Sequence, residues 1–292
     1  MSRLLRGAWS LVFLAACAPR PAPLCVMPAQ LRPGSDVRAE QWYRFLVDRG
    51  LDGTATDCTG APVRWEPPSC QEPDEPGRPL PIARFQARDL VISRVSEDQR
   101  LVWVVTQRFS NGDGLGPIAL VREGGDGPEV IVTGSLRART LRARLALVQI
   151  GGQRFLTAEG EACTSQDPST CRRSTVFLAV RRSRFVAVSL LSRDGACVGP
   201  AEFYLTRVKV IPMSSGTSRR FELISTLTFE TDRIVVQENV TVSDFDPRRP
   251  DTPARLDRQV DDRRVVFVRD GRLVVNARSL WSRVLDEKEG PG

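Results

Sequence analysis

The chain contains no histidine, and of its 42 basic residues only Lys209 and Lys288 are lysine. Without histidine it cannot build a Ser-His-Asp triad, a Cys-His pair or a histidine-ligated metal site. Neither lysine follows a serine at the spacing that penicillin-binding enzymes use. No two cysteines have the spacing of a zinc knuckle. We therefore predict a protein that is not an enzyme and that uses no metal and no other cofactor.

Lysine is scarce, but arginine is abundant, and the formal net charge is +7 against 35 acidic residues. The almost complete preference for arginine over lysine points to genome composition rather than to a selected basic surface. Scattered arginines balanced by acids form an ordinary solvated surface. We predict no nucleic-acid partner.

The first sixteen residues have the anatomy of a secretory signal peptide. Arg3 and Arg6 give a positive start, Ala8 to Ala16 form a short apolar core, and small residues follow at the cleavage site. The apolar stretch is shorter than the roughly 20 residues that a membrane-spanning helix needs. The pattern predicts export and removal of this segment.

Leu14-Ala15-Ala16-Cys17 resembles the lipobox of bacterial lipoproteins. The resemblance covers only the leader and Cys17. It implies that Cys17 receives a diacylglyceryl thioether and becomes the acylated first residue of the mature protein, with the membrane as its partner. Ala18, rather than aspartate, follows the cysteine, which implies sorting to the outer membrane.

Six cysteines remain if Cys17 carries lipid, and an even number in an oxidising compartment predicts disulfides. We expect the pairs Cys58–Cys70 and Cys163–Cys171, which would each close a short polar loop. The last pair is then Cys25–Cys197.

Composition divides the chain into four parts. Residues 1–16 are the signal peptide, and residues 17–34 are the lipidated cysteine with a tether whose five prolines exclude a helix. Residues 35–81 are predicted to hold one helix, from Ser35-Asp36 to the stop at Gly50, followed by a disulfide-bridged loop. The apolar face that should dock this helix on the body consists of Val37, Trp42, Tyr43, Phe45 and Leu46.

Residues 82–292 show short apolar runs with alternating faces, separated by turn residues, which predicts an all-β domain. Successive hairpins without a helix-length crossover indicate an antiparallel meander of about a dozen strands. A barrel, a sandwich and a small propeller all fit this pattern. Asp270-Gly271 predicts a type I′ hairpin turn. The break at 247–262 is predicted to hold a short helix at 254–260, and 280–285 a terminal helical turn.

The strongest binding candidates are Arg142 and Arg144, because alternation along a strand puts both guanidinium groups on one face, where they suit phosphate or carboxylate. Lipid headgroups or anionic envelope glycans would suit such a pair. Neighbouring members of this band are Arg137, Arg139, Arg181, Arg182 and Arg184.

Two segments contain clustered acidic or amide side chains of the kind that bind metal ions. Asn111-Gly112-Asp113-Gly114 lacks the spaced acids of a calcium loop, and a hairpin turn explains it fully. Asp244, Asp246 and Asp251 flank prolines and have arginine neighbours, which is typical of turns. We predict no metal ligands.

The sequence leaves three functions open. The first is a non-enzymatic, lipid-anchored envelope protein that packs with or scaffolds other envelope proteins. The second is a binding module for an apolar or anionic envelope ligand of unknown identity. The third is a hydrolase of envelope polymers that uses two carboxyl groups, for which no residue pair can be selected and no catalytic residue is named.

Overall fold

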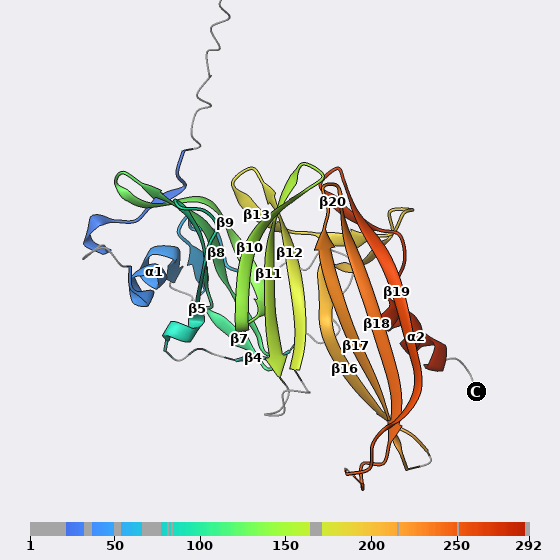
Figure 1. Cartoon of the computed structure of the whole chain (residues 1–292). Helices are drawn as coiled ribbons and strands as arrows, with labels where there is room; N and C mark the ends of the chain where they lie inside the picture. The colour runs from blue at the N-terminus through green and yellow to red at the C-terminus, as the bar shows by residue number, and fades with distance from the viewer. Residues whose placement is uncertain are drawn as a thin grey trace, which may run out of the picture.

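The computed structural model describes residues 22–31, 37–49, 54–65, 77–80, 82, 84–163, 171–214, 216–249 and 251–289. Nearly all of the regular structure is β-strand, with one α-helix near each end of the described chain (Figure 1). The prediction of an all-β protein is confirmed. No helix among these residues is long and apolar enough to cross a membrane.

The first half of the chain builds one curved section of sheet, a small separate two-stranded sheet and one helix. Its elements are β1 (Cys25–Val26), α1 (Ala39–Leu46), β2 (Val47–Arg49), β3 (Ala55–Asp57), β4 (Pro79–Leu80), β5 (Leu90–Arg94), β6 (Gln99–Val104), β7 (Gln107–Phe109), β8 (Asp113–Gly124), β9 (Gly127–Arg139), β10 (Leu141–Ile150) and β11 (Gln153–Cys163).

The second half builds another section, and its long strands β16 to β19 lie side by side (Figure 1). Its elements are β12 (Cys171–Arg181), β13 (Arg184–Ala187), β14 (Ser189–Leu191), β15 (Cys197–Pro200), β16 (Glu202–Pro212), β17 (Ser218–Phe229), β18 (Arg233–Phe245), β19 (Arg255–Arg269), β20 (Arg272–Val275) and α2 (Leu280–Glu289).

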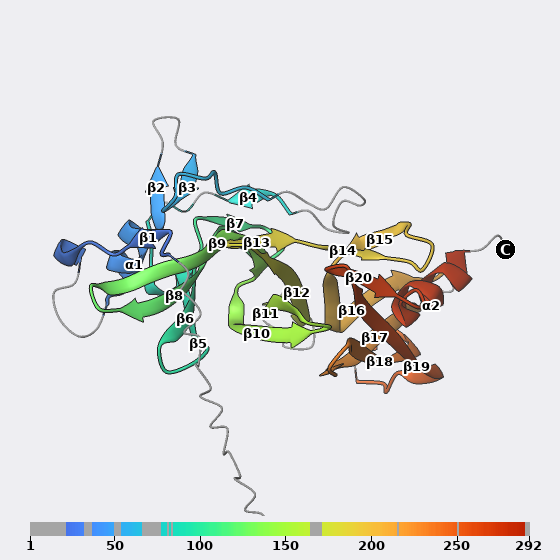
Figure 2. The ribbon, with the colours of Figure 1, turned by 90° about the horizontal axis from the view of Figure 1, so that it is seen from above.

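The two sections meet at β12, which pairs with β11, with β13 and with β16 (Figure 2). Most ladders are antiparallel, as the hairpin pattern predicted. Two are parallel, β13 with β9 and β14 with β20. The segment of β13 and β14 leaves the meander and adds to distant strands, so the result is a large mixed sheet and not a closed barrel.

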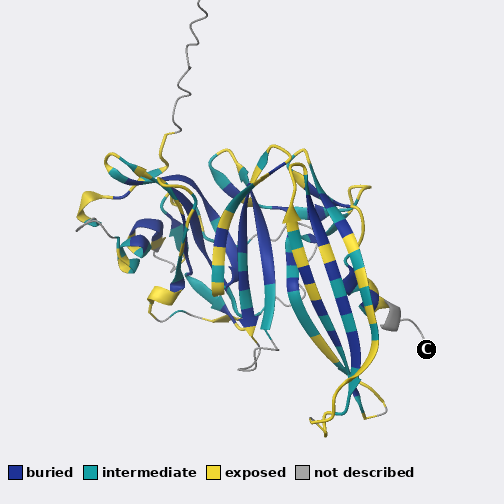
Figure 3. Ribbon diagram, viewed as in Figure 1, coloured by how far each residue is buried: buried dark blue, intermediate teal, exposed yellow. Residues whose placement is uncertain are grey.

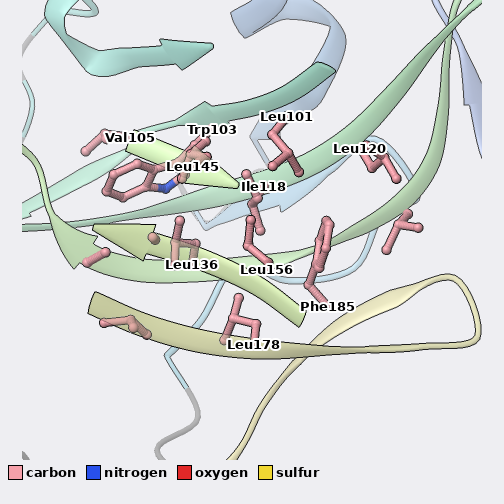
Figure 4. Close-up of a cluster of buried hydrophobic side chains, with 14 of the residues drawn as sticks. Leu101, Trp103, Val105, Ile118, Leu120, Leu136, Leu145, Leu156, Leu178 and Phe185 are labelled. Carbon is pink, nitrogen blue, oxygen red and sulfur yellow. The ribbon is translucent and has the colours of Figure 1, made fainter. Parts of the chain in front are cut away.

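The burial of side chains alternates along many strands, and the buried faces locate the core. Figure 3 shows buried and exposed residues alternating along β17 to β19. The first section encloses a cluster that includes Trp103, Leu136, Leu156 and Phe185 (Figure 4). The second section encloses a separate cluster of buried aliphatic and aromatic side chains around Phe177. Residues of β10, β11 and β12 contribute to both clusters, so the two cores lie on opposite faces of these strands.

The helix α1 docks on the body as predicted, with Trp42, Phe45 and Leu46 buried against β6, β8 and β9. The helix is shorter than predicted, because the chain becomes extended at Val47 and pairs with β3. The predicted cap at Ser35-Asp36 and the stop at Gly50 lie outside the described residues.

One disulfide corrects the predicted pairing. Cys25 bonds Cys58 at an S–S distance of 2.13 Å, so neither Cys58–Cys70 nor Cys25–Cys197 forms. Spacing along the chain favoured the short loop, whereas in space the β1 strand runs along β9, close to the turn after β3. Cys163–Cys171 is confirmed.

A second correction concerns residues 254–260, predicted as a short helix. Residues 255–260 belong to β19, which pairs along its length with β18. Charged residues occupy both faces of this stretch, so no apolar alternation marks it as a strand, and the ladder with β18 decides its conformation. The terminal helical turn at 280–285 is confirmed as part of α2. Asp270 and Gly271 have φ of 51° and 70°, as a type I′ turn requires.

Candidate functional site

A cavity of about 1080 Å³ lies within the second section of the sheet. Its walls come from β16 to β19, the hairpin of β14 and β15, and α2, which Figure 2 shows gathered on one side of the molecule. Its size is that of a large ligand pocket. Unlike the two apolar cores, it is lined with charged side chains, and we refer to it as the charged cavity.

Glu238 is the most buried acid of the charged cavity, with 4% of its surface exposed. It belongs to the buried face of β18, between Val236 and Val240. Its Oε2 lies 3.1 Å from Nε of Arg264 and accepts a hydrogen bond of 3.0 Å from the backbone N–H of Leu280. Its two partners are therefore a guanidinium group and the N-terminus of α2, which both carry positive charge.

Glu202 is the second acid of the cavity wall, at the start of β16. Burial raises the pKa of its carboxyl group, while the charges of Arg139 and Arg207 oppose this rise and Asp113 adds to it. Loss of hydration disfavours the charged form more than the nearby arginines favour it. Glu202 therefore keeps its proton to a higher pH than an exposed glutamate does.

Arg207 projects over two aromatic rings of the wall. Its guanidinium carbon lies 4.4 Å from the centre of the Tyr204 ring and 5.4 Å from that of Trp281. Trp281 belongs to α2. Ser279 caps the first turn of this helix, because its hydroxyl oxygen accepts a hydrogen bond of 3.2 Å from the N–H of Ser282. Cation–π contacts of this kind hold an arginine in one orientation.

The charge of the cavity wall is positive. Five cationic side chains line it, against the carboxyl groups of Glu202, Glu238 and Asp286. The cationic side chains are Arg172, Arg207, Lys209, Arg264 and Arg278. Arg264 lies 3.1 Å from Glu238, and Arg278 lies 2.6 Å from Asp286, so two of the five cations face an acid of the same wall. The arrangement suits a ligand that carries negative charge.

The predicted anion-binding pair lies elsewhere. Arg142 and Arg144 are both exposed on β10, and neither lines the charged cavity. Arg142 lies 3.4 Å from Glu161 and sits at an irregularity of the ladder, with φ of 52°. The structure does not bring the two together with the other arginines of the predicted band.

Two other members of that band are buried. Arg137 and Arg139 lie 3.0 and 2.7 Å from the carboxylate oxygens of Asp113. Asp113 also follows a turn in which Asn111 Oδ1 accepts its N–H. The segment 111–114 is thus a hairpin turn with an ion-pair cluster beneath it.

The acidic residues near 247 form ion pairs. Arg219 donates to both oxygens of Asp244 at 2.6 and 2.8 Å, which holds the pKa of Asp244 below its usual range. Asp246 accepts the Arg248 N–H at 2.9 Å and lies 3.9 Å from Arg249. Among the described residues no group of three potential metal ligands occurs.

Cys17 and Cys70, predicted as the lipidation site and a disulfide partner, lie outside the described residues. Cys197 lines the charged cavity and is disulfide-bonded. The predicted lipid attachment therefore stays a prediction.

Sequence reasoning missed Glu202, Glu238 and Arg264. A signal for two of them was present: Glu238 interrupts the apolar face of β18, and Arg264 precedes Val266 on the buried face of β19. A charge on an apolar face is stable only with a partner. Neither position alone shows which partner the fold supplies.

No protein-family model, curated protein or solved structure matches the chain. Its function is therefore inferred from the geometry and charge of its own residues.

Proposed function

We propose that this chain is a lipoprotein of the bacterial cell envelope, exported and anchored through acylated Cys17, with the outer membrane as its location. Its role is non-enzymatic, and it binds an anionic envelope ligand in the charged cavity. The lipobox resemblance supports the anchoring. The disulfides Cys25–Cys58 and Cys163–Cys171 fit an oxidising compartment.

One observation carries the binding role, namely a large cavity whose wall has an excess of cationic side chains. Guanidinium groups recognise carboxylate and phosphate with directed hydrogen bonds. The rings of Tyr204 and Trp281 beside Arg207 offer a flat apolar surface to the rest of the ligand. A ligand with an acidic group and an apolar or ring portion fits both.

Binding of anilinonaphthalene sulfonate, an anionic aromatic probe, tests the cavity. We expect Arg207→Gln to weaken binding about tenfold, because one charge-assisted hydrogen bond contributes about 1.5 kcal/mol. Arg248→Gln is the matched control, since Arg248 is exposed and does not line the cavity. Equal binding by both variants and the unaltered chain would exclude the cavity as the site.

Cell fractionation tests the anchoring. Changing Cys17→Ser should move the protein from the membrane fraction to the soluble fraction once the membranes are washed with concentrated salt, because the thioether cannot form and salt removes protein that is held by charge alone. A protein that has lost its leader and resists this wash after the change would refute the lipid anchor. Co-purification in mild detergent would then identify partner proteins of the envelope.

A carboxylate-based hydrolase is the second candidate, because Glu202 and Glu238 line one cavity and burial raises the pKa of Glu202. Against it, Glu238 is engaged by Arg264 and by the Leu280 N–H. Incubation with purified envelope polysaccharide separates the two functions. Release of soluble fragments by the unaltered chain, and not by Glu202→Gln, would establish hydrolysis.

A further inference from the structure

Four turns gather at one end of the long strands, those after β10, β12, β17 and β19. The Gly151 N–H donates to Thr231 O at 2.8 Å, and Arg181 Nη2 donates to Gly271 O at 3.2 Å. These bonds join the turns into one surface. We call this surface the arginine end, after its five exposed arginines, Arg154, Arg181, Arg182, Arg269 and Arg272.

The arginine end carries a net positive charge. None of its five arginines forms an ion pair with a carboxylate within the described part of the chain. The acids beside them are Glu230, Asp232 and Asp270. Arg233 lies 2.9 Å from Glu230 and 3.0 Å from Asp232 and so engages two of the three.

The other end of strands β17 to β19 is balanced. It carries four arginines, Arg219, Arg248, Arg249 and Arg255. Asp244 lies near Arg219 and Arg255, and Asp246 lies near Arg249. Two further acids, Asp251 and Asp257, belong to the same end. A basic composition alone therefore does not explain the charge of the arginine end, because the same strands end in a neutral surface on the opposite side.

The N-terminal segment leaves the body beside the turn between β8 and β9, on the same side of the molecule as the arginine end. Leu24 N–H donates to Val130 O, close to the turn between β8 and β9. The parallel pairing of Arg184 with Thr133 shows that the turn before β13 faces the same way as that turn. Figure 1 shows the described N-terminal residues and these turns at the same end of the molecule.

The disulfide of Cys25 shortens the reach of any anchor on Cys17. Cys25 is fixed to Cys58 and paired with Val130. Between Cys17 and Ala22, the first described residue, are five residue steps, which span at most about 17 Å even when fully extended. A lipid on Cys17 therefore keeps this end of the body close to the bilayer surface.

We propose that the arginine end binds the anionic phospholipid headgroups of the membrane that holds Cys17, so that the body is oriented with this end toward the bilayer. The proposal rests on the proposed anchoring, which determines the end that meets the membrane. Guanidinium groups bind phosphate well, and each basic residue at an anionic surface raises membrane affinity about fivefold. Lipid and charge together provide the two signals that stable anchoring requires.

Vesicle sedimentation tests the proposal with the mature chain carrying Cys17→Ser, so that no lipid contributes. We expect it to bind phosphatidylcholine vesicles containing phosphatidylglycerol, to bind pure phosphatidylcholine weakly, and to be released by salt. The triple variant R154Q/R182Q/R272Q should lose about a hundredfold in affinity. The control R248Q/R249Q/R255Q removes the same charge at the opposite end and should bind as before.

Equal losses in the two triple variants would show binding by general charge and would overturn the proposal. The proposal would also be overturned if the Cys17→Ser chain with all its arginines did not bind vesicles that contain phosphatidylglycerol. Circular dichroism and thermal unfolding verify that both variants fold. Because this assay needs no lipid on Cys17, its failure is distinct from a failure of the anchor, which cell fractionation of the Cys17→Ser chain reports.

Discussion

Single residues in the interior of this protein differ in how fully their charge is satisfied. Asp57 is 3% exposed, and its carboxylate accepts from Thr59 and Ala61 on one oxygen and from Thr133 and Arg184 on the other. It ties the β3 turn to β9 and β13. Glu202 has no such set of donors, and burial raises its pKa. Asp57 is thus held by hydrogen bonds that fix the fold, whereas the pKa of Glu202 makes its charge sensitive to pH.

The raised pKa of Glu202 makes stability depend on pH. Its folded-state pKa is above the ordinary value of 4.5, so the folded state binds the proton more tightly than the unfolded state. Stability contributed by the protonated group is therefore complete at low pH and is lost as pH rises above 4.5 through the folded-state pKa.

Glu202→Gln should remove this loss, because glutamine keeps the size and the hydrogen bonding without the titration. We expect the variant to unfold at a higher temperature than the unaltered chain at neutral pH, and at nearly the same temperature at pH below 4.5. Calorimetry across this range measures the difference. Glu97→Gln, at an exposed position, should follow the unaltered chain throughout. A constant gap at every pH would contradict the assignment.

At the scale of elements, alternation predicted most strands, and the dipeptide Asp270-Gly271 predicted a turn in which both residues have positive φ. It could not predict the parallel ladders of β13 and β14, because these short strands carry the same alternation whichever strand they join. The cavity escaped prediction for a related reason. Its lining is spread from Arg172 to Asp286, and only the fold brings these positions together.

The chain between β6 and β7 packs closely against β8 at Gly116. In the sequence, this glycine is the only sign of the close contact. A Cβ atom at Gly116 would lie 1.7 Å from the carbonyl oxygen of Val104. Gly116→Ala should therefore push the two segments apart and lower the free energy of unfolding by about 3 kcal/mol.

Gly125→Ala is the control for this change. Gly125 lies in the turn between β8 and β9, and a Cβ there would meet no atom within 4 Å. It should alter stability by no more than about 0.5 kcal/mol. Urea unfolding of both variants makes the comparison, and a Gly116→Ala protein as stable as the control would show that the contact at Gly116 is not tightly packed.

For the whole molecule, the anchor, the disulfides and the charged surfaces are linked. The Cys25–Cys58 disulfide joins the N-terminal segment to the body. If Cys17 carries lipid, that link keeps the side of the molecule that bears the arginine end near the lipid.

The number of cysteines predicts whether Cys17 is available for lipid attachment or belongs to a disulfide. Cys197 is disulfide-bonded, and the four other described cysteines pair with one another. The sequence has two more, Cys17 and Cys70. If Cys17 carries lipid, Cys70 is the remaining partner for Cys197, and the unreduced, denatured protein should contain no free thiol.

Thiol titration and non-reducing peptide mapping measure this directly, and the Cys17→Ser chain should give the same result, because a lipidated Cys17 contributes no thiol. A free thiol at Cys70, or a peptide joining Cys17 to Cys197, would mean that Cys17 serves the fold instead of the membrane. In that case Cys17→Ser would expose one new thiol per chain. The arginine end would then have no lipid beside it to direct it toward a bilayer.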